Sequence, residues 1–331
     1  MERVGGYNMN IKNSDFLSSK KNTSLSNLRG NDLLDLLYVV ENFAFEYRKK
    51  LFFDEKITFG TEIEYEHCMR YKVNKFINYY YPEWYSKKDR TCNFGGEIAS
   101  RILNNDSLSW KELYLICAYL RSKKSDMYHK ASSHVHVTNT LVSDLNHLKL
   151  FLKLYTVFEP VYFRFACGEI MYPRKTMLEY ARPIAYQLYK NMNKINEAEA
   201  VYLMIPPLDR RSSVNFDTKK DTIEFRLYNG TKYATIHQNN INLSVNSLLA
   251  PSKNLIDEEY LDYRLKNNFL STPENFPLYF ELLLHDALLL SDSIFDNNLD
   301  KIYFLRQYIK TFNKNGKMII PEEKKKILIK K

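Results

Sequence analysis

Glycine is scarce in this chain, with 9 glycines in 331 residues. No G-x-x-x-x-G-K-[ST] motif occurs, so a glycine-rich loop that binds phosphates through its backbone N–H groups is excluded. If a nucleotide binds, its phosphates must be held in another way, such as by metal ions on a sheet. The 26 tyrosines and 20 phenylalanines predict rigid aromatic packing and argue against long flexible linkers.

Cysteines are also few, and they are widely spaced. No C-x-x-C pair occurs, which argues against a zinc knuckle and against a disulfide framework. We expect all four thiols to be reduced and to lie in or near the core, as is typical of cytoplasmic proteins. The four cysteines are Cys68, Cys92, Cys117 and Cys167.

Long apolar runs are missing as well. No apolar stretch near the N-terminus has the pattern of a signal peptide. The most apolar helix-like stretch, residues 278–290, is interrupted by Glu281 and Asp286, which argues against a membrane span. With 45% hydrophobic residues and a mean hydropathy of −0.44, the composition is that of a soluble globular protein.

The chain carries an excess of positive charge. Lysine and arginine number 48 against 39 aspartates and glutamates, which gives a net charge of +9. Part of this excess is a run of lysines in residues 324–331. A basic tail of this kind is most often simply solvated, and an anionic partner is the alternative interpretation.

The stretch at residues 59–66 has the alternation of a β-strand. Glu62, Glu64 and Glu66 fall on one face of such a strand, while Ile63 and Tyr65 fall on the other. Carboxylates crowded on one face repel each other unless a cation or a basic substrate lies between them. This stretch therefore predicts a charged face on a sheet with an apolar back.

Two other stretches repeat the pattern: His134 and His136 share a face, and so do Glu224 and Arg226. One such pair alone is typical of a solvated outer face. Three in one chain instead indicate a single sheet with a charged concave face. Carboxylate and imidazole together suit Mg²⁺ or Mn²⁺, and the arginine is then left to bind phosphate or carboxylate.

Four phrases in this order resemble the motifs of the amidoligase family. They are F-G-T-E-I-E at 59–64, G-G-E-I-A-S at 95–100, S-H-V-H-V at 133–137 and T-I-E-F-R…G-T at 222–231. Four ordered motifs are more specific than any one of them, and the resemblance covers about residues 55–250. The chain departs from the family pattern at Ser132-Ser133, where a glycine often precedes the histidine pair, and at Arg101, where proline is common.

The amidoligase family belongs to the superfamily of glutamine synthetase and glutamate–cysteine ligase. The resemblance implies an α+β fold with a cupped antiparallel sheet of the glutamine-synthetase-like type, covering helices and a helical C-terminal region. It implies an ATP-dependent carboxylate–amine ligase that requires Mg²⁺ or Mn²⁺ and forms an acyl phosphate. The implied substrates are a small-molecule or peptide carboxylate and an amine, and the oligomeric state stays open.

The resemblance also implies roles for individual side chains. The catalytic residues are Arg226 and Glu64, and Arg226 would stabilise the transferring phosphoryl group or hold the substrate carboxylate. From the residues alone Glu97 reads as exposed, and only the resemblance makes it a metal ligand. The implied metal ligands are Glu62, Glu64, Glu97, His134 and Glu224, and the implied nucleotide-binding residues are His136, Arg226 and Arg211.

The predicted organisation has three parts. Residues 1–30 form a flexible polar arm, residues 31–250 the amidoligase-like catalytic domain, and residues 251–331 a helical C-terminal region with the basic tail. Residues 210–216 are predicted to pair with the strand that contains Glu224. Helices are predicted from Asn31 as N-cap to about Lys50, in the region 70–90, over 108–122, over 144–158 until Pro160 bends or ends the helix, and over 236–249.

Three arginines lie among aromatic residues between positions 164 and 182. Any of Arg164, Arg174 and Arg182 could meet a substrate or a phosphate. A surface salt bridge is the expected interpretation for each of them.

Two other functions are compatible with the sequence. A metal-dependent hydrolase could use the same carboxylate–histidine face to activate water, and it would turn over without ATP. A basic nucleic-acid-binding protein could keep an inactive ligase-like fold. The glutamates on the charged face argue against nucleic acid as a partner, because a surface that binds phosphates would not carry three carboxylates.

Overall fold

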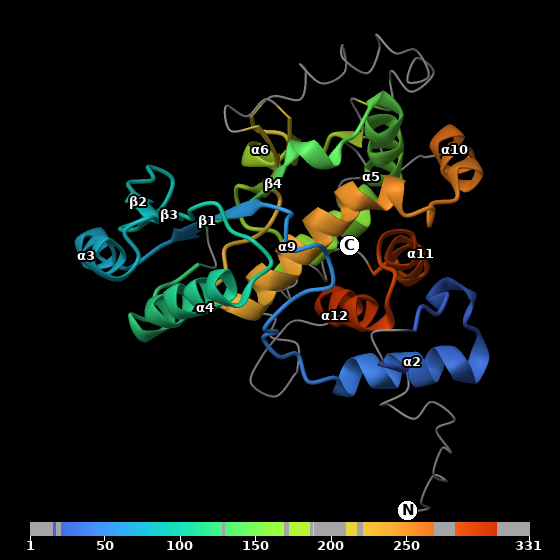
Figure 1. Ribbon diagram of the computed structural model, residues 1–331, viewed down its shortest axis with the longest axis horizontal. Coiled ribbons are helices and arrows are strands. Elements are labelled where there is room, and N and C mark those ends of the chain that lie inside the picture. The colour runs from blue at the N-terminus through green and yellow to red at the C-terminus, as the bar shows by residue number, and fades with distance from the viewer. Residues whose placement is uncertain are drawn as a thin grey trace, which may run out of the picture.

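The computed structural model describes residues 16–17, 21–127, 130–168, 172–185, 188, 210–216, 221–267 and 282–309 (Figure 1). In this part of the chain, six strands form one sheet in the order β2-β3-β1-β4-β6-β5, and all its pairs are antiparallel. The prediction of an α+β fold with an antiparallel sheet is confirmed. The strands are β1 (Phe59–Tyr65), β2 (Tyr85–Lys87), β3 (Gly96–Ala99), β4 (Ser133–Thr138), β5 (Val214–Asn215) and β6 (Thr222–Phe225).

Helices make up most of the remaining described chain. Short 3-10 turns are η1 (Leu25–Asn27), η2 (Asn139–Leu141) and η5 (Ala250–Ser252). The α-helices are α2 (Gly30–Asn42), α3 (Arg70–Tyr80), α4 (Ser107–Ser122), α5 (Leu145–Ala166), the single turn α6 (Met177–Tyr180), α9 (Ala234–Leu249), α10 (Glu258–Lys266), α11 (Leu284–Ile294) and α12 (Asn298–Ile309). Among the described residues, no helix combines the length and the hydrophobicity that crossing a bilayer requires.

The apolar back of the sheet packs on helices. Alternation places Ile63, Val135 and Phe225 on this face, and all three are fully buried. The Phe225 ring lies 6.2 Å from the ring of Phe151 on α5, while α9 contacts β4. Because one face of the sheet is fixed against this core, the register of each strand decides which polar side chains share the opposite face.

Helix α5 is longer than predicted and continues to Ala166, with Pro160 inside it. The helix was predicted to bend or to end at Pro160, and it does not end there. A proline removes one intrahelical hydrogen bond and disfavours the helix interior. Every residue from Phe151 to Phe163 is buried, so tertiary packing holds the helix through this position.

Helix α2 is shorter than predicted. It begins at Gly30 and not after an Asn31 cap, and it ends at Asn42 and not near Lys50. The chain beyond it is irregular, and the Gln238 side chain of α9 holds it by accepting a hydrogen bond from the Arg48 main-chain N–H and donating one to its carbonyl. A long-range contact therefore replaces the last two helical turns.

The end of the predicted flexible arm is packed in this structure. Leu25 is fully buried, and the Asp292 carboxylate of α11 accepts hydrogen bonds from the backbone N–H groups of Leu25 and Ser26. Residues 21–28 thus pack on the folded domain, whereas the sequence predicted a flexible arm up to residue 30.

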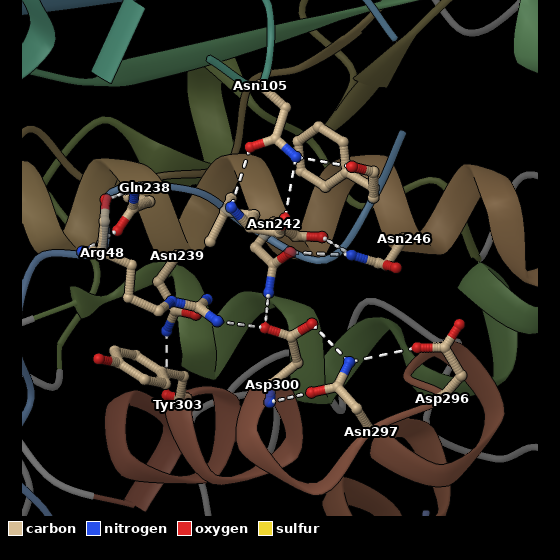
Figure 2. A network of polar contacts seen from close by, with 12 residues as sticks. Arg48, Asn105, Gln238, Asn239, Asn242, Asn246, Asp296, Asn297, Asp300 and Tyr303 are labelled. Carbon is tan, nitrogen blue, oxygen red and sulfur yellow. Dashed lines mark hydrogen bonds and ion pairs between the residues drawn. The ribbon is translucent and has the colours of Figure 1, made fainter. Parts of the chain in front are cut away.

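Helix α9 connects the sheet to the C-terminal helices, because it contacts β4 as well as α11 and α12 (Figure 1). It is polar for a core helix, and the side chains of Asn239 and Asn242 donate hydrogen bonds to residues of α12. The Asp300 carboxylate of α12 accepts from Arg48 Nη1 at 2.6 Å and from Asn242 Nδ2 and Asn297 Nδ2 at 2.9 Å. Figure 2 shows how these side chains converge on the carboxylate. The Arg48 guanidinium also lies 4.1 Å from the centre of the Tyr303 ring. The predicted catalytic and C-terminal regions therefore share one core.

This network predicts a large effect of a small substitution. Asp300→Asn removes the buried charge that balances half-buried Arg48 and places an amide donor where Asp300 accepts several hydrogen bonds. We expect a loss of roughly 3–5 kcal/mol in the free energy of unfolding, measured by urea denaturation. Glu55→Gln, in the exposed Lys50–Glu55 pair, is the control and should cost about 1 kcal/mol or less. Equal losses in the two variants would contradict the role of Asp300.

Candidate functional site

The register of β1 with its two neighbours brings the predicted site residues to one face. Glu64 lies opposite Glu97 of β3, and Glu62 lies opposite His134 of β4. One strand further, His136 lies opposite Glu224 of β6. These side chains are nearly buried, Glu97 and His134 being 4% exposed. The expectation from the residues alone that Glu97 is exposed is therefore wrong.

Two glycines let β3 approach its neighbours. A Cβ on Gly95 would lie 1.7 Å from the carbonyl oxygen of Tyr65, and one on Gly96 would lie 2.6 Å from that of Lys87. No side chain fits at such distances, so both positions require glycine. The pair thereby allows Glu97 to stand directly beside Glu64.

A cavity of about 550 Å³ opens on this face. Its carboxylates come from β1, β3 and the β2–β3 connection, while its arginines come mainly from the segments around residues 174, 211 and 226. A cavity with this mixture suits an anionic ligand bound together with cations. Its lining residues include Glu62, Glu64, Asp89, Glu97, Ser132, His134, Lys87, Lys130, Arg174, Arg210, Arg211 and Arg226.

Glu62 lies between the two histidines. His134 Nδ1 is 3.0 Å from Glu62 Oε2, and His136 Nε2 is 3.4 Å from Glu62 Oε1. Burial by itself raises the pKa of Glu62, but the hydrogen bond with His134 and the electrostatic attraction of both histidines outweigh it and hold the pKa well below its ordinary value. Glu62 is therefore ionised at neutral pH.

A second group of carboxylates consists of Glu64, Asp89 and Glu97. One oxygen atom from each lies within 4.8 Å of the others. Burial and the negative charge of Glu62 raise the pKa of Glu97, while Lys87 Nζ, 2.7 Å from Glu97 Oε1, opposes the shift. Asp89 is a member that the sequence analysis missed, because it lies in the connection between β2 and β3 and not on an alternating strand.

Glu224 and Arg226 contact each other at the far side of β4. Arg226 Nη1 donates to Glu224 Oε1 at 2.5 Å, and Asn215 Nδ2 donates to Glu224 Oε2 at 2.9 Å. Burial raises the pKa of Glu224, but the charges of His134 and Arg226 outweigh it and the pKa lies below its ordinary value. The predicted pairing of the segment before β6 with β6 is confirmed for Val214 and Asn215.

The predicted nucleotide-binding residues line two adjoining cavities. Arg211 and Arg226 line the 550 Å³ cavity, and the Arg211 guanidinium lies 5.5 Å from the centre of the Tyr180 ring. His136 instead lines a neighbouring cavity of about 480 Å³, which also contains Glu62 in its wall. His136 thus lines a different cavity, yet it lies close to Arg226, because His136 Nε2 is 3.7 Å and Arg226 Nη1 is 2.5 Å from the same oxygen, Glu224 Oε1. Glu62 is common to both cavities.

Arg174 is not the surface residue that was expected. It is 3% exposed, and it donates from Nη1 to the carbonyls of Leu227 and Tyr228 and from Nη2 to that of Arg226. Burial lowers the pKa of its guanidinium to about 10. This arginine fixes the main chain that follows β6, including the residue that carries the Arg226 side chain, and it lines the cavity itself. Arg164 and Arg182 are not among the lining residues.

Glu66 does not join the charged face, although it continues the alternation of β1. It is fully buried, and its two oxygens accept backbone hydrogen bonds from two different segments. Oε1 accepts from Asn93 N–H at 3.2 Å, and Oε2 accepts from Lys130 N–H at 3.0 Å. Glu66 thereby holds together two loops that border the cavity.

Ser132 is another residue that the sequence analysis missed. Its Oγ lies 2.9 Å from His134 Nε2, and its backbone N–H donates to Glu64 Oε2 at 2.7 Å. A signal was present, since extending the strand alternation back by two residues from His134 places Ser132 on the same face.

The residues present fit a divalent cation at one point in particular. His136 Nε2 is buried and forms no hydrogen bond with the described residues, yet it lies 3.4 Å from Glu62 Oε1 and 3.7 Å from Glu224 Oε1. An imidazole nitrogen and two carboxylate oxygens are ordinary ligands of Mn²⁺ and acceptable ones of Mg²⁺. The geometry thus groups His136, where the sequence predicted His134, with Glu62 and Glu224.

A scan of the chain against models of known protein families gives no match, and a search of curated proteins gives no significant match.

Glu64 on β1 and Glu66 just after its end allow a test of structure against function. Glu66 accepts backbone hydrogen bonds with both oxygens, so Glu66→Gln must turn an amide donor towards a backbone N–H. We expect it to lower the free energy of unfolding by about 1.5–3 kcal/mol, the value of one hydrogen bond to a charged group. Glu64→Gln keeps an oxygen for the Ser132 N–H and should change stability far less. A greater loss in Glu64→Gln, measured by chemical denaturation, would contradict this division of roles.

Proposed function

We propose that the protein is an ATP-dependent carboxylate–amine ligase with a glutamine-synthetase-like sheet, as in the amidoligase family. The observation that carries the proposal is the strand register, which gathers the residues of four separate motifs around one cavity. Glu64 and Glu97 face each other, and Glu62 lies beside His134 and His136. The four motifs had been linked only by their order in the sequence, and their meeting at one site supports a common function.

The reaction would proceed in two steps. The γ-phosphoryl group of ATP passes to the substrate carboxylate, which forms an acyl phosphate and releases ADP. The amine then attacks the acyl carbon, forms the amide bond and releases phosphate. Divalent ions bound at this site would supply positive charge that offsets the negative charge of the phosphates.

Two groups of side chains would hold these ions. Glu62, His136 and Glu224 form one group, and Glu64, Asp89 and Glu97 form the other. His134 lies 3.0 Å from Glu62 and 3.3 Å from Glu224, so it would orient both carboxylates towards the ion. A histidine or carboxylate fixed by neighbouring hydrogen bonds presents its ligand atom in one orientation.

The cations of the 550 Å³ cavity would bind the anionic groups of the substrates. Arg226 is oriented by Glu224 and by the Tyr180 carbonyl, which accepts from Nε at 3.4 Å. Lys130 and Arg211 line the same cavity. A planar guanidinium held in this way can stabilise charge on the transferring phosphoryl group or hold a carboxylate.

Metal-dependent nucleotide binding is the first expected result. ATP with Mg²⁺ or Mn²⁺ should raise the melting temperature, because a ligand that binds only the folded state stabilises it. With a panel of carboxylates and hydroxylamine as the amine, the protein should release ADP and form a hydroxamate. Glu62→Gln should abolish both effects, while Asp35→Asn on α2 should leave them intact. Turnover of a substrate without ATP would indicate the metal-dependent hydrolase, and unchanged melting with metal and ATP would count against the site.

The role of Arg226 gives a second expected result. Arg226→Lys keeps the positive charge but cannot contact Glu224, the Tyr180 carbonyl and a substrate together. We expect turnover to fall roughly a thousandfold, with a much smaller change in ATP affinity. Arg264→Lys is the control, because Arg264 makes an equally well-formed pair with Asp286 but does not line the cavity. Near-parental hydroxamate formation by Arg226→Lys would remove Arg226 from the catalytic residues.

A further inference from the structure

Ser132, His134 and Glu62 form a continuous chain of hydrogen-bonded groups in the wall of the 550 Å³ cavity. Ser132 Oγ lies 2.9 Å from His134 Nε2, and His134 Nδ1 lies 3.0 Å from Glu62 Oε2. His134 Nδ1 also lies 3.3 Å from Glu224 Oε1, so both carboxylates favour the proton at Nδ1, and a neutral ring must then accept from the serine hydroxyl at Nε2. We propose that Ser132 is a nucleophile that takes an acyl group from an ester, with His134 as its base and Glu62 orienting the base.

The geometry meets the general requirement for an activated hydroxyl. A nucleophile and its base must lie about 2.6–3.2 Å apart, and a third group must orient the base. Ser132 and His134 lie two residues apart on one strand face, and Glu62 lies opposite His134 in the register. The arrangement therefore follows from strand pairing and does not depend on a flexible loop.

The backbone around Ser132 is fixed on both sides. Ser132 forms a β-bridge with Asn229, and its N–H donates to Glu64 Oε2 at 2.7 Å. Asn229 in turn accepts from the Arg174 N–H and donates to the carbonyls of Cys167 and Tyr172. The Ser132 hydroxyl is thus held in one place relative to the His134 imidazole. Ser132, His134 and Glu62 all line the cavity that a substrate would enter.

The proposed step balances without a metal ion or a nucleotide. Ser132 Oγ attacks the carbonyl carbon of an ester, a C–O bond forms, and the hydroxyl proton passes to His134 Nε2. The bond to the leaving alkoxide breaks, and this oxygen takes the proton from His134. Water then attacks the acyl-serine by the same route, which releases the carboxylic acid and restores Ser132.

The charges that line the cavity determine where the carbonyl oxygen of the ester substrate must lie. The Ser132 N–H is already bonded to Glu64, so a backbone donor from this residue does not serve the developing negative charge. Lys130, Arg174 and Arg226 line the same cavity and supply positive charge. We expect the carbonyl oxygen to face these cations and to point away from Glu64, since donors aimed at the developing charge lower the barrier.

The inference goes beyond the ligase proposal and stands apart from it. Glu62 and His134 take part in both schemes, so the two uses of the site exclude each other at any moment. If Ser132 only orients His134 as part of a metal site, it should show no reactivity of its own.

The test uses the full chain in EDTA, without ATP, and a fluorophosphonate probe whose P–F bond breaks as a serine Oγ–P bond forms. We expect the folded protein to be labelled at Ser132, as mapped by mass spectrometry of peptides, and the heat-denatured protein to stay unlabelled. His134→Asn should slow labelling about a hundredfold, the value of general base catalysis. Labelling of the unmodified chain needs no variant, so a misfolded variant cannot obscure the result.

Ser133 provides the matched control. It is buried on the opposite face of the strand, and its Oγ has no hydrogen-bond partner among the described residues. Ser132→Ala should abolish labelling, while Ser133→Ala should retain it. No labelling above the denatured protein, or labelling that persists in Ser132→Ala, would overturn the proposal. Since metal and ATP are absent, this outcome is separate from failure of the ligase assay.

Discussion

The site depends on the pairing of Glu62 with the histidines of the neighbouring strand. Removing a carboxylate from water is costly unless a partner and hydrogen bonds compensate, and here several carboxylates lie within one small region of a sheet. His134 and His136 hold Glu62 ionised, Lys87 contacts Glu97, and Arg226 contacts Glu224. Glu62 meets the histidines only in the observed register of β1 with β4, so the charge balance of the site depends on the strand pairing.

Buried carboxylates also serve as structural connectors elsewhere in the chain. Glu66 bonds the backbone of two loops at the edge of the cavity, and Asp292 bonds the segment around Leu25. Glu159, on the central helix α5, accepts from the N–H groups of Ile184 and Ala185. In each case a carboxylate satisfies backbone donors that lie far from it in the sequence, which is how irregular chain can be buried around a regular core.

Local periodicity predicted what depends on neighbours in sequence. The alternation at Glu62 and Glu64, at the histidines and at Glu224 located three strands and the face that they share. The helices at 107–122 and 234–249 also lie close to their predicted ranges. Long-range contacts decided the rest: α5 passes through Pro160 because it is buried on all sides, and Asp89 and Arg174 reach the cavity from irregular segments whose course no period reveals.

The polar contacts of α9 determine when the fold can become complete. Arg48 and Asp300 are separated by 252 positions, and Asn242 lies between them in the chain and joins the same carboxylate. Until both distant segments have docked, the Asn239 and Asn242 amides of α9 lack the partners that α12 supplies in the described part of the chain. A high share of such non-local contacts slows folding and makes it cooperative. During synthesis, the sheet with its charged face would therefore gain its final rigidity only after α12 has emerged.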